Sequence, residues 1–174
     1  MLTKVPRPVK NQGHVSRDET LADLYARPGF LLRRGHQIAV GIFVQECAAL
    51  GLTPPQHGVL VVADNAPGLD QAGLARALGF DRATVGALIH GLERRGLLRR
   101  TSSPADLRRK SLAVTPRGRA ALRRAQAAVR RTSDRILAPL DASERRKFVA
   151  LLERLTSALN GASRTPVLPP APER

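Results

Sequence analysis

The sequence predicts a mainly α-helical fold with one small β-hairpin, and three observations support this prediction. Apolar residues recur at the three- and four-residue spacing of amphipathic helices, as in residues 85–92. Thr or Asp residues that can cap a helix precede most of these segments. Two short segments, 97–101 and 110–114, have the pattern of strands. The length of 174 residues suits one domain with tails.

The N-terminal part is expected to contain an arm and one long helix. Residues 1–27 are basic, polar and proline-containing, so we expect a flexible arm with a short helix that ends before Pro28 and Gly29. The segment 28–52 carries helical apolar spacing, and a first long helix is predicted over about residues 30–50.

Residues 53–115 are predicted to form three shorter helices followed by the hairpin. Each helix has a capping residue before it, and the third and fourth also have a terminating glycine after them. These residues are Thr53 with Pro54 for the second helix, Asp70 and Gly79 for the third, and Asp81 and Gly96 for the fourth.

Residues 116–160 are predicted to form a long connecting helix and a last helix. Thr115 and Pro116 combine a cap with a proline in the first turn. Asp141, with an acidic residue three positions later, has the pattern of a capping box. Several prolines follow, so residues 161–174 are expected to be a disordered tail.

The composition favours a polyanionic partner. Lys and Arg number 29 against 14 Asp and Glu, which gives a formal net charge of +15. Such a charge favours nucleic acid first and an anionic membrane surface second. The chain has no Trp and only 3% aromatic residues, which argues against stacking the bases of single strands. Double-stranded DNA is therefore the expected partner.

Other classes of protein are excluded by what the sequence lacks. The single cysteine, Cys47, excludes a disulfide within the chain and a multi-cysteine metal site. No stretch has the length and apolarity of a membrane span, and the N-terminus lacks a signal-peptide core, so we expect a soluble cytoplasmic protein without a membrane partner. No phosphate-binding glycine loop or nucleophile elbow is present, so neither catalysis nor a cofactor is expected.

The order short helix, glycine turn, helix, hairpin is that of a winged helix-turn-helix. In this interpretation the helix that follows Asp81 is the recognition helix, and its outer face carries small and polar residues. Arg82 lies in the first turn, where it could read guanine. Thr84 could bond a phosphate or a base, and Gly86 could allow close approach to a groove wall. The predicted contacts on this helix are Arg82, Ala83, Thr84, Gly86 and Ala87.

Most of the positive charge lies in and after this helix. Residues 82–131 contain 14 Lys or Arg against two acidic residues, a net charge of +12. The later arginines could equally form a solvated face. The hairpin is the stronger candidate, because a basic tip can enter a minor groove or straddle phosphates. The residues predicted to contact DNA here are Arg100, Arg108, Arg109 and Lys110.

Several segments together resemble the MarR family of transcription regulators. The resemblance covers about residues 28–160, and its most specific parts are the Asp-x-Arg of the wing and the Val-Thr-x-x-Gly that follows it. The matching segments are Leu52–Gln56, Leu74–Ala75, Thr84–Val85, Leu92–Arg100, Asp106–Arg108 and Val114–Gly118.

The resemblance implies a homodimer formed by the first and last helices, bound to a pseudo-palindromic operator. It also implies repression that a small ligand relieves. In the family the wing Asp braces the hairpin and the wing Arg reaches DNA, so these roles are expected of Asp106 and Arg108.

The last helix supports the dimer independently, because its apolar stripe lacks an obvious partner within a small winged domain. The stripe could instead pack only on its own chain. The predicted interface residues are Phe148, Leu152, Leu155 and Leu159.

The family's effector cavity lies between its dimerisation and DNA-binding parts. Basic and His residues in that region suit a small aromatic carboxylate, with apolar neighbours as walls for the ring. Residues 18–38 also resemble a branch of the family that is tied to nicotinate catabolism and answers to a hydroxylated nicotinic acid. The expected ligand contacts are Arg33, His36, Gln37, Val40, His57 and Leu60.

Four alternatives to a ligand-responsive repressor differ in what they require of the sequence. An architectural protein would coat DNA without choosing a sequence. Redox sensing through Cys47 is a second alternative, although a buried inert thiol is the simpler interpretation. A metal sensor would need clustered ligands, whereas the four His are scattered. A membrane-surface helix would need bulky apolar residues opposite its charge, and residues 116–135 offer mainly Ala.

Overall fold

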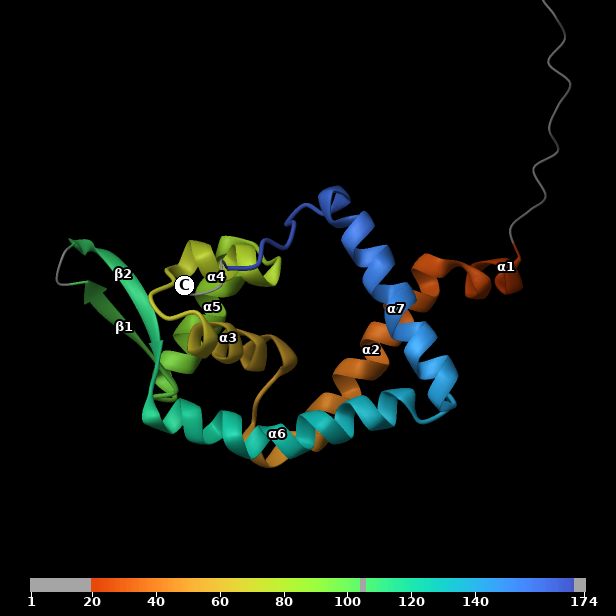
Figure 1. Cartoon of the computed structure of the whole chain (residues 1–174), viewed down its shortest axis with the longest axis horizontal. Helices are drawn as coiled ribbons and strands as arrows, with labels where there is room; N and C mark the ends of the chain where they lie inside the picture. The colour runs from red at the N-terminus through yellow and green to blue at the C-terminus, as the bar shows by residue number, and fades with distance from the viewer. Residues whose placement is uncertain (1–19, 104–105, 171–174) are drawn as a thin grey trace, which may run out of the picture. The chain divides into compact units, whose positions relative to one another are not determined.

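A computed structural model of the protein describes residues 20–103 and 106–170 (Figure 1). The chain divides between Gly35 and His36 into two units, which are described separately. The elements, in chain order, are α1 (Leu21–Ala26), α2 (Pro28–Glu46), the 3-10 helix η1 (Ala48–Leu50), α3 (Pro54–Asn65), α4 (Gln71–Leu78), α5 (Arg82–Arg94), β1 (Leu98–Ser103), β2 (Asp106–Val114), α6 (Pro116–Leu137), α7 (Ala142–Ala158) and the 3-10 helix η2 (Asn160–Ala162).

The first unit contains α1 and the beginning of α2. Thr20 caps α1, and its hydroxyl accepts a hydrogen bond from the backbone N–H of Asp23 at 3.2 Å. The hydrogen bonds from Thr20 also lower the pKa of Asp23 below its ordinary value. The rings of Tyr25 and Phe30 lie 5.1 Å apart, and the Arg33 guanidinium lies 4.8 Å from the Phe30 ring. The predicted short helix before Pro28 is confirmed.

In the second unit, the helices begin where the capping residues predict. Thr53, Asp70, Asp81, Thr115 and Asp141 each accept a backbone N–H of the first turn through the side chain. Thr53 and Asp141 complete capping boxes with the side chains three residues later. Local sequence therefore sets where these five helices start.

The main core lies where α3, α4, α5, the hairpin and α6 meet. Val59, Leu60 and Ile89 are fully buried at its centre, together with residues of the other elements. A second, smaller cluster joins Phe43 and Cys47 to Ala128 of α6. The predicted inner face of α5 is confirmed, with Leu88 only half-buried.

Two predicted boundaries are corrected by the structure. The first long helix ends at Glu46 and continues as the separate 3-10 turn η1, where Gly51 adopts a positive φ of 57°. The hairpin strands are longer than predicted, because backbone pairing continues through polar residues that carry no apolar alternation. Arg108 and Arg109 therefore belong to β2 rather than to a loop, and Lys110 lies in this strand as predicted.

The third correction concerns the C-terminal tail. Residues 163–170 follow a defined path and hydrogen-bond to the end of α4, with Leu168 N–H donating to the Arg76 carbonyl at 2.9 Å. Prolines predicted disorder here, but a segment without internal secondary structure can be held by partners elsewhere in the chain.

None of the helices in the described ranges combines the length and the apolarity that a membrane-spanning helix needs.

Candidate nucleic-acid interface

The helix α5 has one buried and one exposed face. Val85, Ile89 and Leu92 are fully buried in the main core. The opposite face is exposed to solvent and consists of Arg82, Ala83, Thr84, Ala87 and His90. The predicted recognition face therefore faces solvent, and the opposite face of the same helix packs in the main core.

The first turn of α5 is held by its cap. Asp81 accepts the backbone N–H of Thr84 at 2.8 Å and the Thr84 hydroxyl at 2.7 Å. These bonds lower the pKa of Asp81, the side-chain bond being the largest cause. The Thr84 hydroxyl donates its hydrogen to Asp81, so it is left as an acceptor and has no hydrogen to offer a phosphate. A phosphate contact through this hydroxyl would require its hydrogen bond to Asp81 to break, whereas the backbone bond of the cap could remain.

The structure shows a contact at Gly86 that the sequence did not reveal. A Cβ at this half-buried position would lie 3.0 Å from Nε2 of Gln71 in α4. That amide donates to the Arg82 carbonyl at 3.1 Å. Glycine therefore leaves room for the Gln71 amide in the position that this hydrogen bond requires, whereas a Cβ would make the amide shift by a few tenths of an ångström. Gln71 is a positioning residue that sequence reasoning missed, since a lone Gln at a helix start carries no pattern.

The wing is an antiparallel pair in which Leu98 lies opposite Val114 and Ser102 opposite Lys110. Leu98, Leu112 and Val114 are buried, whereas Lys110 is exposed. Arg100 forms an ion pair with Glu93 of α5 at 3.2 Å, which ties the wing to the recognition helix. The side chains for which bracing and DNA contact were predicted at Asp106, Arg108 and Arg109 lie outside the described part.

The Val-Thr-x-x-Gly motif anchors the wing. The Thr115 hydroxyl donates to the Gly96 carbonyl at 2.7 Å and accepts the Gly118 N–H at 3.0 Å. A Cβ at Gly118 would overlap the Leu97 carbonyl oxygen and lie 2.7 Å from Val114. Only glycine lets α6 start so close to both strands. The motif therefore holds the start of α6 against the Gly96–Leu97 backbone, next to the base of the wing.

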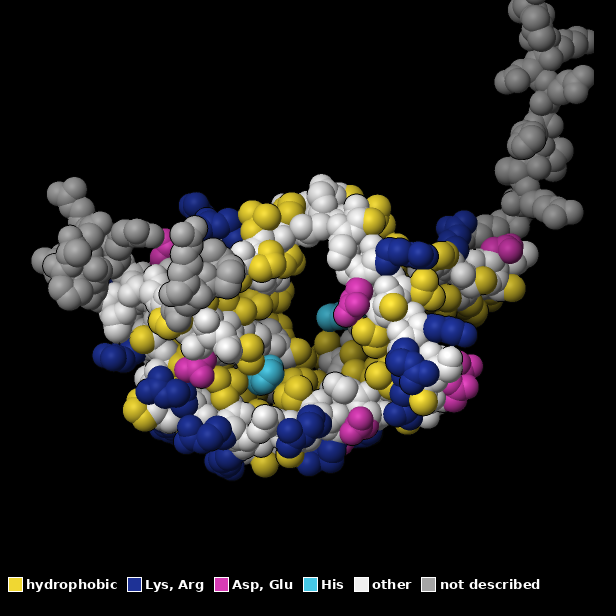
Figure 2. Space-filling model, in the orientation of Figure 1, with side chains coloured by type: hydrophobic (Ala, Val, Ile, Leu, Met, Phe, Trp, Pro, Cys, Tyr) yellow, Lys and Arg dark blue, Asp and Glu magenta, His cyan; other side chains and the backbone are white. Residues whose placement is uncertain are grey.

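The Lys and Arg residues of segment 82–131 fall into two groups, those that bond to other parts of the fold and those that are exposed. Figure 2 shows Lys and Arg side chains gathered along α6. Several are engaged: Arg95 donates to the Leu50 and Gly51 carbonyls at 2.7 Å, and Arg131 pairs with Glu46 at 2.7 Å. Arg119 lies 3.7 Å from Asp64. The net charge of +12 in residues 82–131 thus overstates the charge that is available to DNA. In contrast, Arg82 has no ion pair among the described residues.

The residues expected to contact an effector lie on different elements. Arg33 belongs to the first unit, whereas His36 and Gln37 are exposed on α2 in the second, where Val40 is half-buried. Leu60 is wholly buried in the main core, which corrects its expected place as a pocket wall.

His57 lines a groove of about 430 Å³ between α3 and α6. The imidazole ring lies 5.8 Å from Phe43, and burial lowers the pKa of His57 below its ordinary value. The sequence analysis missed the other lining residues, two of which lie on α3, although the spacing of the five on α6 places those five on one helical face. They are Val61, Asn65, Leu122, Arg123, Gln126, Val129 and Arg130.

Cys47 is fully buried beside Phe43 and Ala128. Burial is the largest cause that raises the pKa of its thiol, and the Glu46 carboxylate adds to it. A thiol of this kind is a poor nucleophile and a poor redox sensor. No cluster of three or more metal-binding side chains occurs among the described residues.

The helix α7 buries none of its side chains in the single chain. Phe148, Leu155 and Leu159 are 42%, 41% and 57% exposed, and Leu152 is half-buried. Within the described chain the predicted interface stripe is therefore left largely uncovered.

Comparison with known proteins gives a family match and a similar regulatory protein. Residues 50–109 match the profile of the MarR family. A Thauera aromatica protein described as a transcriptional regulatory protein for the hcr operon is 41% identical over 73% of this chain and 77% of its own length.

Two solved structures are similar over most of the chain. The repressor CouR of Rhodococcus jostii bound to a 23-mer DNA duplex has a TM-score of 0.73 and 34% identity, covering 80% of this chain and 99% of that chain. Bordetella bronchiseptica BpsR, whose DNA binding is regulated by 6-hydroxynicotinic acid, has a TM-score of 0.70 and 30% identity, covering 76% and 94%.

Proposed function

The chain belongs to the MarR family of winged-helix transcriptional regulators, which are not enzymes, and from that premise we propose that it is a homodimeric repressor released from its operator by a small aromatic carboxylate. The observation that carries the proposal is the exposed first turn of α5. Arg82 stands there on a helix fixed by the Asp81 cap, the Gln71 amide and three buried side chains. Rigid placement of this kind is what base reading requires.

The wing supplies the second contact in this proposal. Lys110 is exposed on β2, and Arg108 and Arg109 precede it in the same strand. Basic side chains on a hairpin beside a recognition helix suit the phosphates and minor groove that flank a major-groove site. Asp106 would brace this hairpin, as in the family.

The dimer is supported by the exposed face of α7. Leaving Phe148, Leu155 and Leu159 in water costs hydrophobic free energy that a second copy would recover. A twofold dimer would present two α5 helices to major grooves about 34 Å apart, one turn of DNA. We therefore expect a pseudo-palindromic operator.

The groove between α3 and α6 is the proposed effector site. Arg123 and Arg130 can form charge-assisted hydrogen bonds to a carboxylate, and Gln126 adds a donor. Leu122 and Val129 offer apolar contacts for a ring. The relative regulated by 6-hydroxynicotinic acid supports a hydroxynicotinate as the first compound to try.

Binding to two duplexes tests the proposal. The full chain selects a duplex from a random pool, and its affinity for that duplex is compared with its affinity for a scrambled one at one salt concentration. We expect on the order of a thousandfold preference for the selected duplex, which hydroxynicotinate reduces. Equal affinity for both would identify an architectural protein instead, and would overturn the proposal.

A further inference from the structure

The segment that follows α7 returns to the helix-turn-helix and is here named the C-terminal strap, residues 163–170. Figure 1 shows it running from the end of α7 across to α4. The side chain of Asn160 fixes its course with two hydrogen bonds to Val167. Nδ2 donates to the Val167 carbonyl at 2.9 Å, and Oδ1 accepts the Val167 N–H at 2.8 Å.

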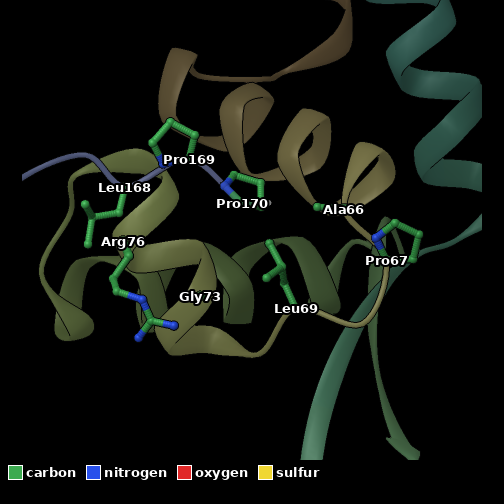
Figure 3. A pocket seen from close by; sticks show the side chains of 8 residues that line it. All are labelled: Ala66, Pro67, Leu69, Gly73, Arg76, Leu168, Pro169 and Pro170. Atoms are coloured by element: carbon green, nitrogen blue, oxygen red, sulfur yellow. The ribbon is translucent and has the colours of Figure 1, made fainter. Parts of the chain in front are cut away.

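The strap then docks on the turn between α4 and α5. Leu168 N–H donates to the Arg76 carbonyl at 2.9 Å, and the Thr165 hydroxyl donates to the Gly79 carbonyl at 2.6 Å. The last carbonyls of a helix lack partners within the helix, so they are natural acceptors for such donors. In Figure 3, Leu168 and the two prolines that follow it lie alongside α4, near Arg76.

The backbone of Gly79 leaves room for the C-terminal strap. Its φ of 64° is the left-handed conformation that ends α4. A Cβ on this glycine would lie 2.8 Å from Cγ2 of Val167 and 3.0 Å from the Thr165 carbonyl oxygen. The missing side chain therefore serves both the helix end and the docking of the strap.

The strap also loses little entropy when it docks. Pro166, Pro169 and Pro170 restrict its backbone, and each proline also holds the preceding residue extended. A segment that is already extended loses less conformational entropy on binding than a flexible segment does. The same prolines that predicted disorder therefore favour a stiff connection.

The strap closes a loop within the second unit. The helix-turn-helix is joined to α7 on one side through the wing and α6, and on the other side through the strap. A rigid body held at two points can rotate only about the line that joins them, so most swinging motions are prevented. In a dimer formed through α7, this connection restrains the distance between the two α5 helices.

We propose that the C-terminal strap sets the half-site spacing that the dimer accepts, by fixing each helix-turn-helix relative to α7. This inference rests on the proposed function, because half-sites exist only for a dimeric operator-binding protein. Thr165 and Asn160 are its positioning residues, and neither needs to touch DNA.

The test compares the full chain with a chain that ends at Ala162. Both are titrated with the selected duplex and with versions that are one or two base pairs longer or shorter between the half-sites. We expect the full chain to lose roughly tenfold or more in affinity on the altered spacings, and the shortened chain to lose less than about threefold. The shortened chain should also bind the selected duplex roughly tenfold more weakly, since only part of its population has the right spacing.

Point variants guard against a folding defect. Thr165→Val removes the hydroxyl that donates to Gly79 and should shift the spacing profile toward that of the shortened chain. Thr165→Ser keeps the hydroxyl and is the matched control, which should behave as the full chain. Circular dichroism and sedimentation establish that each variant is folded and dimeric.

A measurement without DNA completes the test. A nitroxide on Ala87→Cys reports the distance between the two α5 helices, while the buried Cys47 stays unlabelled. The distance distribution should broaden when the strap is absent. Unchanged spacing preference and an unchanged distribution would overturn the inference, whereas a full chain that selects no duplex would overturn the proposed function instead.

Discussion

The helices α3, α4 and α5 with the wing, here together named the reading part, and the helix α7 bury their apolar residues very differently. The helices α3, α4 and α5 share a core with the wing, and Leu60, Leu74 and Ile89 are fully buried in it. In contrast, α7 buries none of its side chains, and Phe148, Leu155 and the adjoining Leu159 are exposed. The difference teaches that the reading part covers its apolar side chains within one chain, whereas the described residues leave those of α7 uncovered.

The largest effect is expected from the core of the reading part. Leu60→Ala should lower the free energy of unfolding by about 2–5 kcal/mol, because it leaves a cavity at a site without solvent access. Denaturant unfolding at two protein concentrations measures this loss of unfolding free energy. The loss should be the same at both concentrations. A loss below about 1 kcal/mol would contradict a self-sufficient core.

The second prediction concerns the exposed face of α7. Leu155→Asp should weaken the dimer, and operator affinity should fall on the order of a hundredfold, because each half-site is then bound without the help of the other. Sedimentation velocity and fluorescence anisotropy measure the two effects. Glu153→Asp, on the same exposed helix, is the control. A variant that stays dimeric would show that α7 is not the interface.

The third prediction tests base reading by α5. Arg82→Ala should cost about 1–3 kcal/mol of binding and relax the preference at one base pair in each half-site. Arg94→Ala removes the same charge at the other end of the helix and should leave base preference intact. If every sequence weakens equally with Arg82→Ala, the side chain contacts only phosphate.

The fourth prediction concerns the wing. Arg108→Ala should weaken binding to all sequences and lower the slope of log affinity against log salt by about one. Titrations at four salt concentrations measure the slope, with Arg108→Lys as the charge-preserving control. An unchanged slope would remove this arginine from the interface.

The smallest effect is expected from His57. Burial lowers its pKa in the folded state, so the unfolded state binds the proton more readily. Stability should therefore fall as the pH drops below about 6.5, the ordinary value for His. His57→Gln should lose this part of the pH dependence. Thermal unfolding between pH 5 and pH 8 compares the two, and identical slopes would show that His57 is as accessible in the folded protein as in the unfolded one.

Much of the reading part is predictable because its signals are local. Caps at Thr53, Asp70 and Asp81 act on backbone groups two or three residues away, so each is visible in a short window of sequence. The outward face of α5 follows from helical periodicity in the same way. Gly118 could also be picked out, but its overlap with Leu97 is visible only once the strands are placed.

The groove between α3 and α6 and the C-terminal strap were not predictable on the same grounds. The groove joins His57 to Arg123, and their pairing depends on how α3 packs against α6. The strap joins Thr165 to Gly79, 86 positions away along the chain. No short window contains both members of either pair.

The sequence by itself determined the helix starts, the exposed recognition face, the excess of positive charge and the membership of the MarR family. Each of these depends on composition or on residues within a few positions of one another. Only the tertiary structure decided that Gly86 packs against Gln71, that Arg95 and Arg131 serve the fold, and that the proline-rich end binds α4. The physical reason is that these contacts join residues far apart in the chain, and their partners are set by packing rather than by local preference.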